Sequence, residues 1–202
     1  MLDSKIGFIG LGKLGMPCAE ACAKKGFDVT GYDIMARESN LIHVKDNLED
    51  AVKERDFIFI SVPTPHEEGY DGREPTSDKP VKDFDYTHLI KAVKDVDERV
   101  DEGTLIAVIS TVLPGTVRRE IVPLIKRGKF IYNPYLIAQG TVKWDMRNPE
   151  MIMIGTSSGH ESRETKTLRD VYDPILEKNA RYEIGTWEEI ESLKVFYNTF
   201  IT

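Results

Sequence analysis

The sequence has few cysteines, no excess of basic residues and no long apolar run. Only two cysteines occur in 202 residues, so the disulfide framework of small secreted domains is excluded and a reducing, cytoplasmic location is expected. Cys18 and Cys22 lie in one Ala-rich helical stretch with no histidine nearby, which favours small core residues over a metal or redox site. We expect no bound metal.

Positive charge is also scarce. The chain has 27 Lys and Arg against 34 Asp and Glu, a formal net charge of −7. A broad nucleic-acid-binding surface needs a basic excess, so any anionic ligand must instead meet local donors. No apolar run approaches the roughly 20 residues that a membrane-spanning helix needs. We therefore expect neither a nucleic-acid nor a membrane partner.

Apolar residues make up 41% of the chain, which is typical of a folded globular protein. Short runs rich in Ile, Val and Phe alternate with amphipathic stretches, as in parallel strands joined by helices. The expected strands are 6–9, 27–32, 41–44, 57–62, 105–110, 130–132, 151–154 and 182–184. The expected helices are 14–25, 48–55, 86–101, 117–126 and 162–178, and 63–85 and 133–150 are expected to be long loops. The pattern predicts an α/β fold, a Rossmann-like, doubly wound, mainly parallel sheet with helices on both faces.

A glycine motif joins the first expected strand to an Ala-rich helix. Its spacing is Gly-x-Gly-x-x-Gly, in which the first glycine permits a tight turn, the second admits a pyrophosphate and the third allows close helix–strand packing. The N–H groups of the helix N-terminus can then bind phosphates. The cofactor contacts predicted in this loop are Gly10, Leu11, Gly12, Lys13, Leu14 and Gly15.

The second expected strand ends in an acid, Asp33. A carboxylate at this position accepts hydrogen bonds from the adenosine ribose hydroxyls and repels a 2′-phosphate, so it favours NAD over NADP. Arg37 lies close enough to contribute to the cofactor site and to keep NADP open as an alternative.

Ligands of an open parallel sheet bind beyond the carboxyl ends of the strands. The motifs expected there are Val-Pro-Thr-Pro at 62–65, Ser-Thr-Val-Leu-Pro-Gly-Thr at 110–116 and Asn-Pro-Tyr-Leu-Ile-Ala-Gln-Gly at 133–140. The last segment adds Lys194 and Asn198, which are four residues apart and so share one helix face.

Taken in this order, the motifs resemble the UDP-glucose/GDP-mannose dehydrogenase family, and nearly the whole chain resembles its N-terminal NAD-binding domain. The resemblance implies NAD as the cofactor, with Val62, Thr64, Ser110 and Thr111 among its contacts and the two threonines on the nicotinamide side.

The same resemblance implies that Lys194, Asn198 and Thr111 are catalytic, with the first two facing the reacting sugar carbon. A lysine suits this role because a cation stabilises an alkoxide as it forms. The implied reaction oxidises the primary alcohol of a nucleotide sugar to a carboxylate in two hydride transfers to NAD. In that family, a cysteine outside this domain holds the intermediate as a thioester.

The expected substrate-side loop departs from the family. Its residues are Tyr135, Leu136 and Gln139, and the family has acids in place of Tyr135 and Gln139. A phenol, with a pKa near ~10, is a poor general base at neutral pH.

Two alternatives therefore stay open. The glycine loop, the Lys-x-x-x-Asn pair and the short connection from Asp33 to Val62 are shared with the 6-phosphogluconate and β-hydroxyacid dehydrogenases. The other alternative is a non-catalytic module that binds NAD(H) and needs a partner chain, because Tyr135 replaces an acid and neither cysteine can serve as the nucleophile.

The resemblance divides the chain into an NAD-binding Rossmann-like domain, 1–186, and the start of a connecting or dimerisation helix, 187–202. The central and nucleotide-sugar-binding domains of the family would lie beyond this sequence, so a nucleotide sugar would need a second domain. The apolar residues of the last segment predict a homodimer or a partner chain. They are Ile190, Leu193, Phe196 and Phe200.

Overall fold

The computed structural model describes residues 4–201 except 71, 72, 74, 76 and 137–139. The described strands are β1 Lys5–Ile9, β2 Asp28–Tyr32, β3 His43–Val44, β4 Phe57–Ile60, β5 Leu105–Val108, β6 Lys129–Tyr132, β7 Met151–Thr156 and β8 Arg181–Thr186. The helices are α1 Gly15–Lys24, α2 Leu48–Val52, α3 Thr87–Asp97, α4 Val142–Arg147, α5 Arg163–Tyr172 and α6 Trp187–Ile201. Two shorter helical turns are η1 Val117–Ile121 and η2 Val122–Leu124.

The described strands form one sheet in the order β3-β2-β1-β4-β5-β6-β7-β8. All neighbouring strands are parallel except β6 and β7, which pair antiparallel at Tyr132 and Gly155. The chain reverses its direction of winding between β1 and β4, which is the position where sheets of this class bind ligands. The predicted doubly wound, mainly parallel sheet is confirmed.

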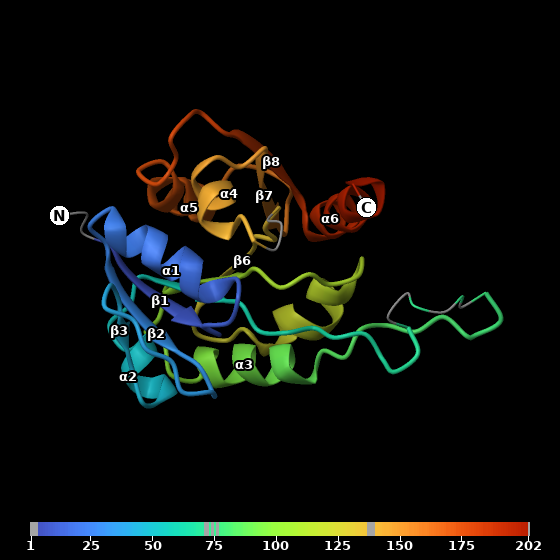
Figure 1. Cartoon of the computed structure of the whole chain (residues 1–202), viewed down its shortest axis with the longest axis horizontal. Coiled ribbons are helices and arrows are strands. Elements are labelled where there is room, and N and C mark those ends of the chain that lie inside the picture. The colour runs from blue at the N-terminus through green and yellow to red at the C-terminus, as the bar shows by residue number, and fades with distance from the viewer. Residues whose placement is uncertain (1–3, 71–72, 74, 76, 137–139, 202) are drawn as a thin grey trace.

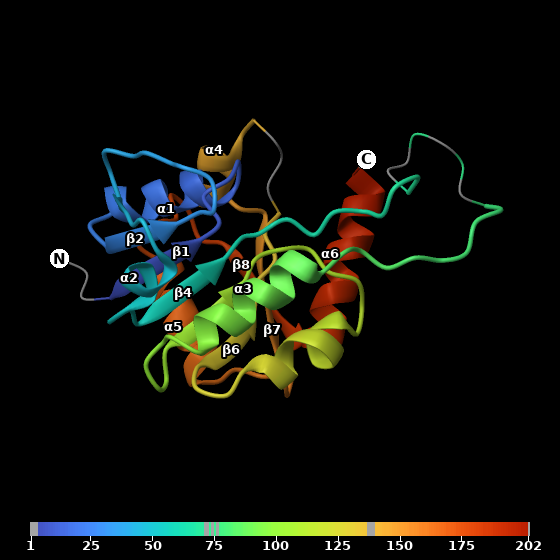
Figure 2. The same ribbon diagram turned by 90° about the horizontal axis from the view of Figure 1, so that it is seen from below.

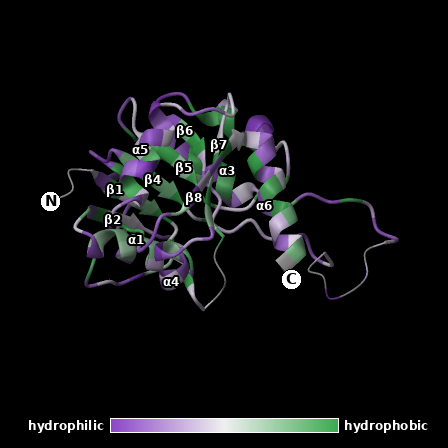
Figure 3. Ribbon diagram, turned by 90° about the horizontal axis from the view of Figure 1, so that it is seen from above, coloured by the Kyte–Doolittle hydropathy of each residue, from purple (hydrophilic) through white to green (hydrophobic). Residues whose placement is uncertain are grey.

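Side chains on successive strand residues pack on opposite faces of the sheet. Phe57 and Phe59 of β4 belong to the core beneath α1, α4 and α5, whereas Ile58 and Ile60 belong to the core beneath α2, α3, η1 and the first turn of α6. In Figure 1, α1, α4 and α5 lie in the upper part and α2 and α3 in the lower part, while α6 lies to the right of β7 and β8. Figure 3 shows the hydrophobic strands lying between more polar helices. None of the described helices is long and apolar enough to cross a bilayer.

Local sequence explains where two helices begin. The Asn47 side chain accepts the N–H of Asp50 at 2.9 Å and so caps α2. The hydroxyls of Ser162 and Thr165 each accept the other residue's backbone N–H, which caps α5. Such caps replace hydrogen bonds that the first helical N–H groups lack.

Two local predictions are wrong. Residues 117–126 were expected to form one helix, but η1 is a π-helical turn and η2 is a 3₁₀ turn, because Pro123 has no N–H with which to continue an α-helix. Residues 133–150 were expected to be a loop, but they contain α4, which is too short to show a helical period. The described residues of the expected loop 63–85 project away from the sheet between β4 and α3 (Figure 2).

The chain's last helix is partly packed on the domain. Ile190 is buried in the core beneath α6, so the expectation that it needs a partner is wrong, whereas Leu193 is half-buried and packs against the same cluster. Phe196 and Phe200, farther along α6, are 62% and 86% exposed.

A buried carboxylate fixes the approach to β6. Asp97, at the end of α3, accepts the backbone N–H groups of Lys126 at 2.8 Å, Arg127 at 3.2 Å and Gly128 at 2.9 Å. Three donors on one carboxylate hold the turn that leads into the central sheet.

We expect Asp97→Asn to lower the free energy of unfolding by about 1 to 3 kcal/mol, because the amide accepts fewer of these buried N–H groups. Asp95→Asn is the matched control, since it removes only a surface ion pair with Lys91, worth at most about 0.5 kcal/mol. Urea denaturation of both variants measures the difference. Equal stabilities would contradict the role given to Asp97.

Candidate functional site

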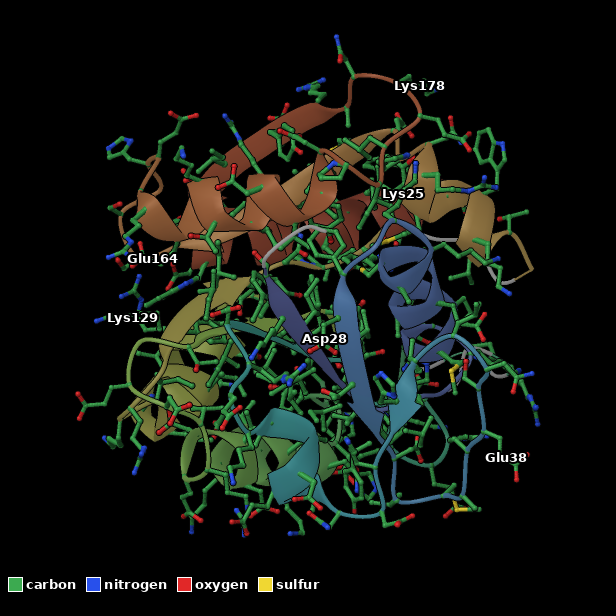
Figure 4. The ribbon with its side chains drawn as sticks, turned by 90° about the vertical axis from the view of Figure 1, so that its left-hand side faces the viewer. Lys25, Asp28, Glu38, Lys129, Glu164 and Lys178 are labelled. Carbon is green, nitrogen blue, oxygen red and sulfur yellow. The ribbon has the colours of Figure 1, made fainter. Side chains whose placement is uncertain are left out.

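The sheet register places three strand ends at one edge. Ile9 of β1 pairs with Ile60 of β4, which pairs with Val108 of β5. The residues that follow these strands therefore lie side by side. The opposite end of the sheet is seen in Figure 4, where Asp28 and Lys129, the first residues of β2 and β6, lie at the surface.

Each glycine of the loop after β1 meets a different requirement. Gly10 has φ 90° and a Cβ there would lie 2.4 Å from the Ser61 carbonyl oxygen. A Cβ at Gly15 would lie only 1.9 Å from the Gly10 carbonyl oxygen. A Cβ at Gly12 would meet nothing within 4 Å, so the backbone there faces open space. This is the arrangement that a dinucleotide pyrophosphate requires.

Asp33 lies beside this loop at the end of β2. Its carboxylate accepts the N–H of Leu11 at 2.7 Å and the N–H of Met35 at 2.8 Å, and the Arg37 guanidinium lies 3.7 Å away. The structure thus brings both predicted ribose-side residues, Asp33 and Arg37, to the glycine loop.

The loops after β4 and β5 are joined by two hydrogen bonds. The Thr64 hydroxyl donates to the Thr111 carbonyl at 2.7 Å, and the Ser110 hydroxyl donates to the Val62 carbonyl at 2.6 Å. These four predicted cofactor contacts, including the two threonines expected on the nicotinamide side, therefore lie together.

Lys194 is a buried cation on α6. It is 6% exposed, and its ammonium group donates to the Asn198 side-chain oxygen at 2.9 Å. Burial lowers the pKa of Lys194 to about 8. A lysine with this pKa changes its charge near physiological pH, which suits proton transfer.

Some of these groups, among them Ser110, Thr111, Lys194 and Asn198, line a cleft of about 1110 Å³, and its described lining does not include Val62 or Thr64. Its described lining is Lys13, Leu14, Pro17, Ile109, Ser110, Thr111, Tyr135, Gly140, Thr141, Val142, Lys143, Trp144, Arg147, Lys194 and Asn198. The lining includes all three predicted catalytic residues and two of the glycine-loop residues, but not Asp33 or Arg37. Within this described lining there are four cationic side chains and no carboxylate, so the cleft suits an anionic ligand.

The expected substrate-side loop is more buried than its sequence suggests. The Tyr135 ring packs edge-on against Phe59 and Tyr172 in the core beneath α1. Its hydroxyl is buried without a hydrogen-bond partner among the described residues, and burial raises the pKa of Tyr135 well above the usual value. Leu136 packs against the core on the other face, and Gln139 lies outside the described residues.

Sequence reasoning missed several residues near the cleft. Trp144, 55% exposed, and Lys143 reach the cleft from α4, whose helical pattern is too short to detect. Glu191 is completely buried and lies three residues before Lys194. An acid at this spacing from a candidate lysine is the one local signal that could have identified it.

Comparison with known proteins identifies the family. The sequence profile of the NAD binding domain of the UDP-glucose/GDP-mannose dehydrogenase family matches residues 35–176. A UDP-N-acetyl-D-glucosamine 6-dehydrogenase from Salmonella typhi is 29% identical, with 98% of this chain and 49% of that protein covered.

Two solved structures share the fold. A UDP-glucose dehydrogenase from Pyrobaculum islandicum has a TM-score of 0.76 at 25% identity, covering 98% of this chain and 49% of that one. A GDP-mannose dehydrogenase from Pseudomonas aeruginosa has a TM-score of 0.79 at 23% identity, covering 97% and 49%. This chain spans about half the length of each of these three proteins.

The glycine loop gives a matched pair of substitutions. We expect Gly12→Ala to fold with little change in stability but to bind NAD at least about tenfold more weakly, because its methyl group enters the open space above the backbone. Gly15→Ala should instead lower the melting temperature, since its Cβ overlaps the Gly10 carbonyl. Calorimetry with NAD and thermal unfolding separate the two effects. Unchanged NAD affinity in Gly12→Ala would contradict the assignment.

The buried tyrosines Tyr135 and Tyr172 give a second matched pair of substitutions. Tyr135→Phe should raise the free energy of unfolding by about 1 kcal/mol, because it removes an unpaired buried hydroxyl. Tyr172→Phe should lower it by about 1 to 2 kcal/mol, because the Tyr172 hydroxyl donates to the buried Asn133 side chain at 2.6 Å. Denaturant unfolding measures both, and a loss of stability in Tyr135→Phe would show that its hydroxyl has a partner.

Proposed function

The chain belongs to the UDP-glucose/GDP-mannose dehydrogenase family, and we propose that it is the cofactor-binding part of an NAD-dependent nucleotide-sugar 6-dehydrogenase. The reaction would oxidise the primary alcohol of the sugar toward the carboxylate. The division at residue 186 and the site roles given to single residues are part of this proposal.

One observation carries the proposal: Lys194 and Asn198 line the same cleft as Ser110 and Thr111. A helix near the end of the chain thus brings an ionisable amine to the strand ends where the cofactor loop lies. The described lining contains one other ionisable group that is buried, Tyr135, and its raised pKa keeps its hydroxyl protonated at neutral pH.

Lys194 would handle the proton of the alcohol. Bound NAD would supply the acceptor for the hydride that leaves the alcohol carbon. The hydroxyl proton must leave as the carbonyl forms, and neutral Lys194 can accept it. The resulting ammonium group, held by the Asn198 oxygen at 2.9 Å, would then stabilise negative charge on the substrate oxygen.

The charge and shape of the cleft favour a nucleotide sugar. Its four cationic residues, Lys13, Lys143, Arg147 and Lys194, suit a diphosphate, and the exposed Trp144 ring can stack on a base. Lys143 and Arg147 are themselves paired with Glu20 and Glu177 behind them. These ion pairs orient the two cations at the rim of the cleft.

A second candidate function is a non-catalytic module that binds NAD(H) and associates with a partner chain. The burial of Tyr135 favours it, because this position offers no base for the hydrolysis that completes oxidation to a carboxylate. The exposed Phe196 and Phe200 on α6 favour a partner, either a second copy or another chain.

NADH formation tests the first function. In the protein completed by the second domain that a nucleotide sugar needs, incubation with NAD and each of UDP-glucose, UDP-N-acetylglucosamine, UDP-N-acetylmannosamine and GDP-mannose should increase absorbance at 340 nm with at least one sugar. The rate should rise with pH through about 8 as Lys194 loses its proton. Lys194→Met should lower kcat at least about a hundredfold.

A panel of β-hydroxyacids and 6-phosphogluconate serves as the control for the other dehydrogenase families. Turnover of that panel alone would contradict the nucleotide-sugar assignment. NAD binding without any turnover would support the second candidate, and light scattering would then measure its association state.

A further inference from the structure

Glu191 is a carboxylate completely removed from solvent on α6. One of its oxygens accepts the N–H of Gly115 at 2.6 Å and the other accepts the N–H of Val117 at 2.7 Å. Gly115 belongs to the loop that carries Thr111 from β5 to η1, and Val117 is the first residue of η1. Glu191 itself does not line the cleft, so it has no direct contact with a ligand there.

The loop after β5 depends on side chains from other elements. The Val112 N–H donates to the Tyr132 hydroxyl at 3.3 Å, and the Leu113 N–H donates to the Tyr86 hydroxyl at 3.0 Å. Glu191 completes this set, and it is the member that comes from α6. Because the loop lacks a strand or α-helix of its own here, these contacts determine its position.

A buried carboxylate is a costly way to pack a helix on a sheet. Burial raises the pKa of Glu191, while its hydrogen bonds with Val117 and Gly115 act in the opposite direction. An apolar residue would pack the same helix without desolvating a charge. The carboxylate therefore contributes directional contacts. Its two oxygens accept two separate N–H groups, which fixes both the position and the rotation of α6 relative to the loop.

Arg118 of η1 makes two further contacts with α6, since its guanidinium lies 4.8 Å from the centre of the Trp187 ring and also pairs with a carboxylate. Arg118 pairs with Glu188 at 2.5 Å, but both side chains are substantially exposed. Water screens such a pair, and its contribution is at most about 1 kcal/mol. Trp187 and Ile190 bury the first turn of α6, so the helix stays attached to the domain without Glu191.

We propose that Glu191 is a positioning residue, which holds Lys194 at a working distance from Thr111 by hydrogen-bonding α6 to the loop after β5. The role of Lys194 in this inference rests on the proposed function. Lys194 lies about one helical turn beyond Glu191, so a small tilt or slide of α6 moves its amine relative to the cleft.

The test compares Glu191→Gln with Glu188→Gln. Both replace one carboxylate of α6 by an amide, but only the first acts on the buried link to Gly115 and Val117, where the amide has one acceptor oxygen in place of two. Circular dichroism and thermal unfolding establish that each variant is folded. Glu191→Asp is the second variant, because its shorter carboxylate keeps the charge but cannot reach both N–H groups.

The first readout is the pH dependence with which Lys194 reacts with acetic anhydride, followed by peptide mass spectrometry. The midpoint of this pH profile, which reports the pKa of Lys194, should lie near 8 in the unaltered chain and in Glu188→Gln. It should rise toward the ordinary lysine pKa of about 10.4 in Glu191→Gln, because a displaced Lys194 becomes hydrated. Loss of the carboxylate charge alone would lower the midpoint, so a rise reports displacement.

The second readout is turnover, by the protein completed with its second domain, of the sugar that the unaltered protein oxidises. Glu191→Gln should lower kcat about 10- to 100-fold with little change in KM, Glu191→Asp should show a smaller loss, and Glu188→Gln should change kcat less than about twofold. Glu191 variants whose Lys194 midpoint is unchanged or lowered would overturn the proposal, even if they are less stable. If no nucleotide sugar is oxidised, the proposed function fails, whereas the acetylation profile still decides the role of Glu191.

Discussion

The hydrogen bonds from Gly115 and Val117 to the buried Glu191 carboxylate are the contact on which the geometry of the cleft depends. The described lining of the cleft comes from the residues after β5, from α6 and from the regions of α1 and α4, and β5 and α6 are far apart in the sequence. Apolar packing holds the first turn of α6 on the sheet. Because this packing is non-directional, small rotations of α6 cost little free energy. The carboxylate adds direction, and it keeps Lys194 in the buried position that lowers its pKa.

The cofactor loop depends on a different constraint, the close approach of two backbones. Gly15 packs against the Gly10 carbonyl with no room for a methyl group, whereas Gly12 faces open space. Glycine is therefore required at the first and third positions for folding and at the second for access. A chain with a net charge of −7 thus offers an anionic cofactor local N–H donors and nearby cations, without a positive surface overall.

Much of the fold could be predicted because its signals are local. Strand residues such as Phe57 and Ile58 alternate between two cores, and the glycine spacing marks the first strand–helix turn. The errors lie where local patterns are short or conflict: Pro123 breaks an apparent helix, and α4 has too few residues to show a period. Ile190 looked like an interface residue because the sequence does not show that β7 and β8 lie beneath it.

The sequence by itself determined the α/β class, the dinucleotide loop and the pairing of Lys194 with Asn198, since each depends on residues a few positions apart. The tertiary structure decided which polar groups lose water and which partners they find. It placed Tyr135 in the core with an unpaired hydroxyl, gave Asp97 its three donors and joined Glu191 to the loop after β5. Those outcomes depend on how helices pack across the sheet, and a buried polar group must pair with whatever that packing brings within about 3 Å.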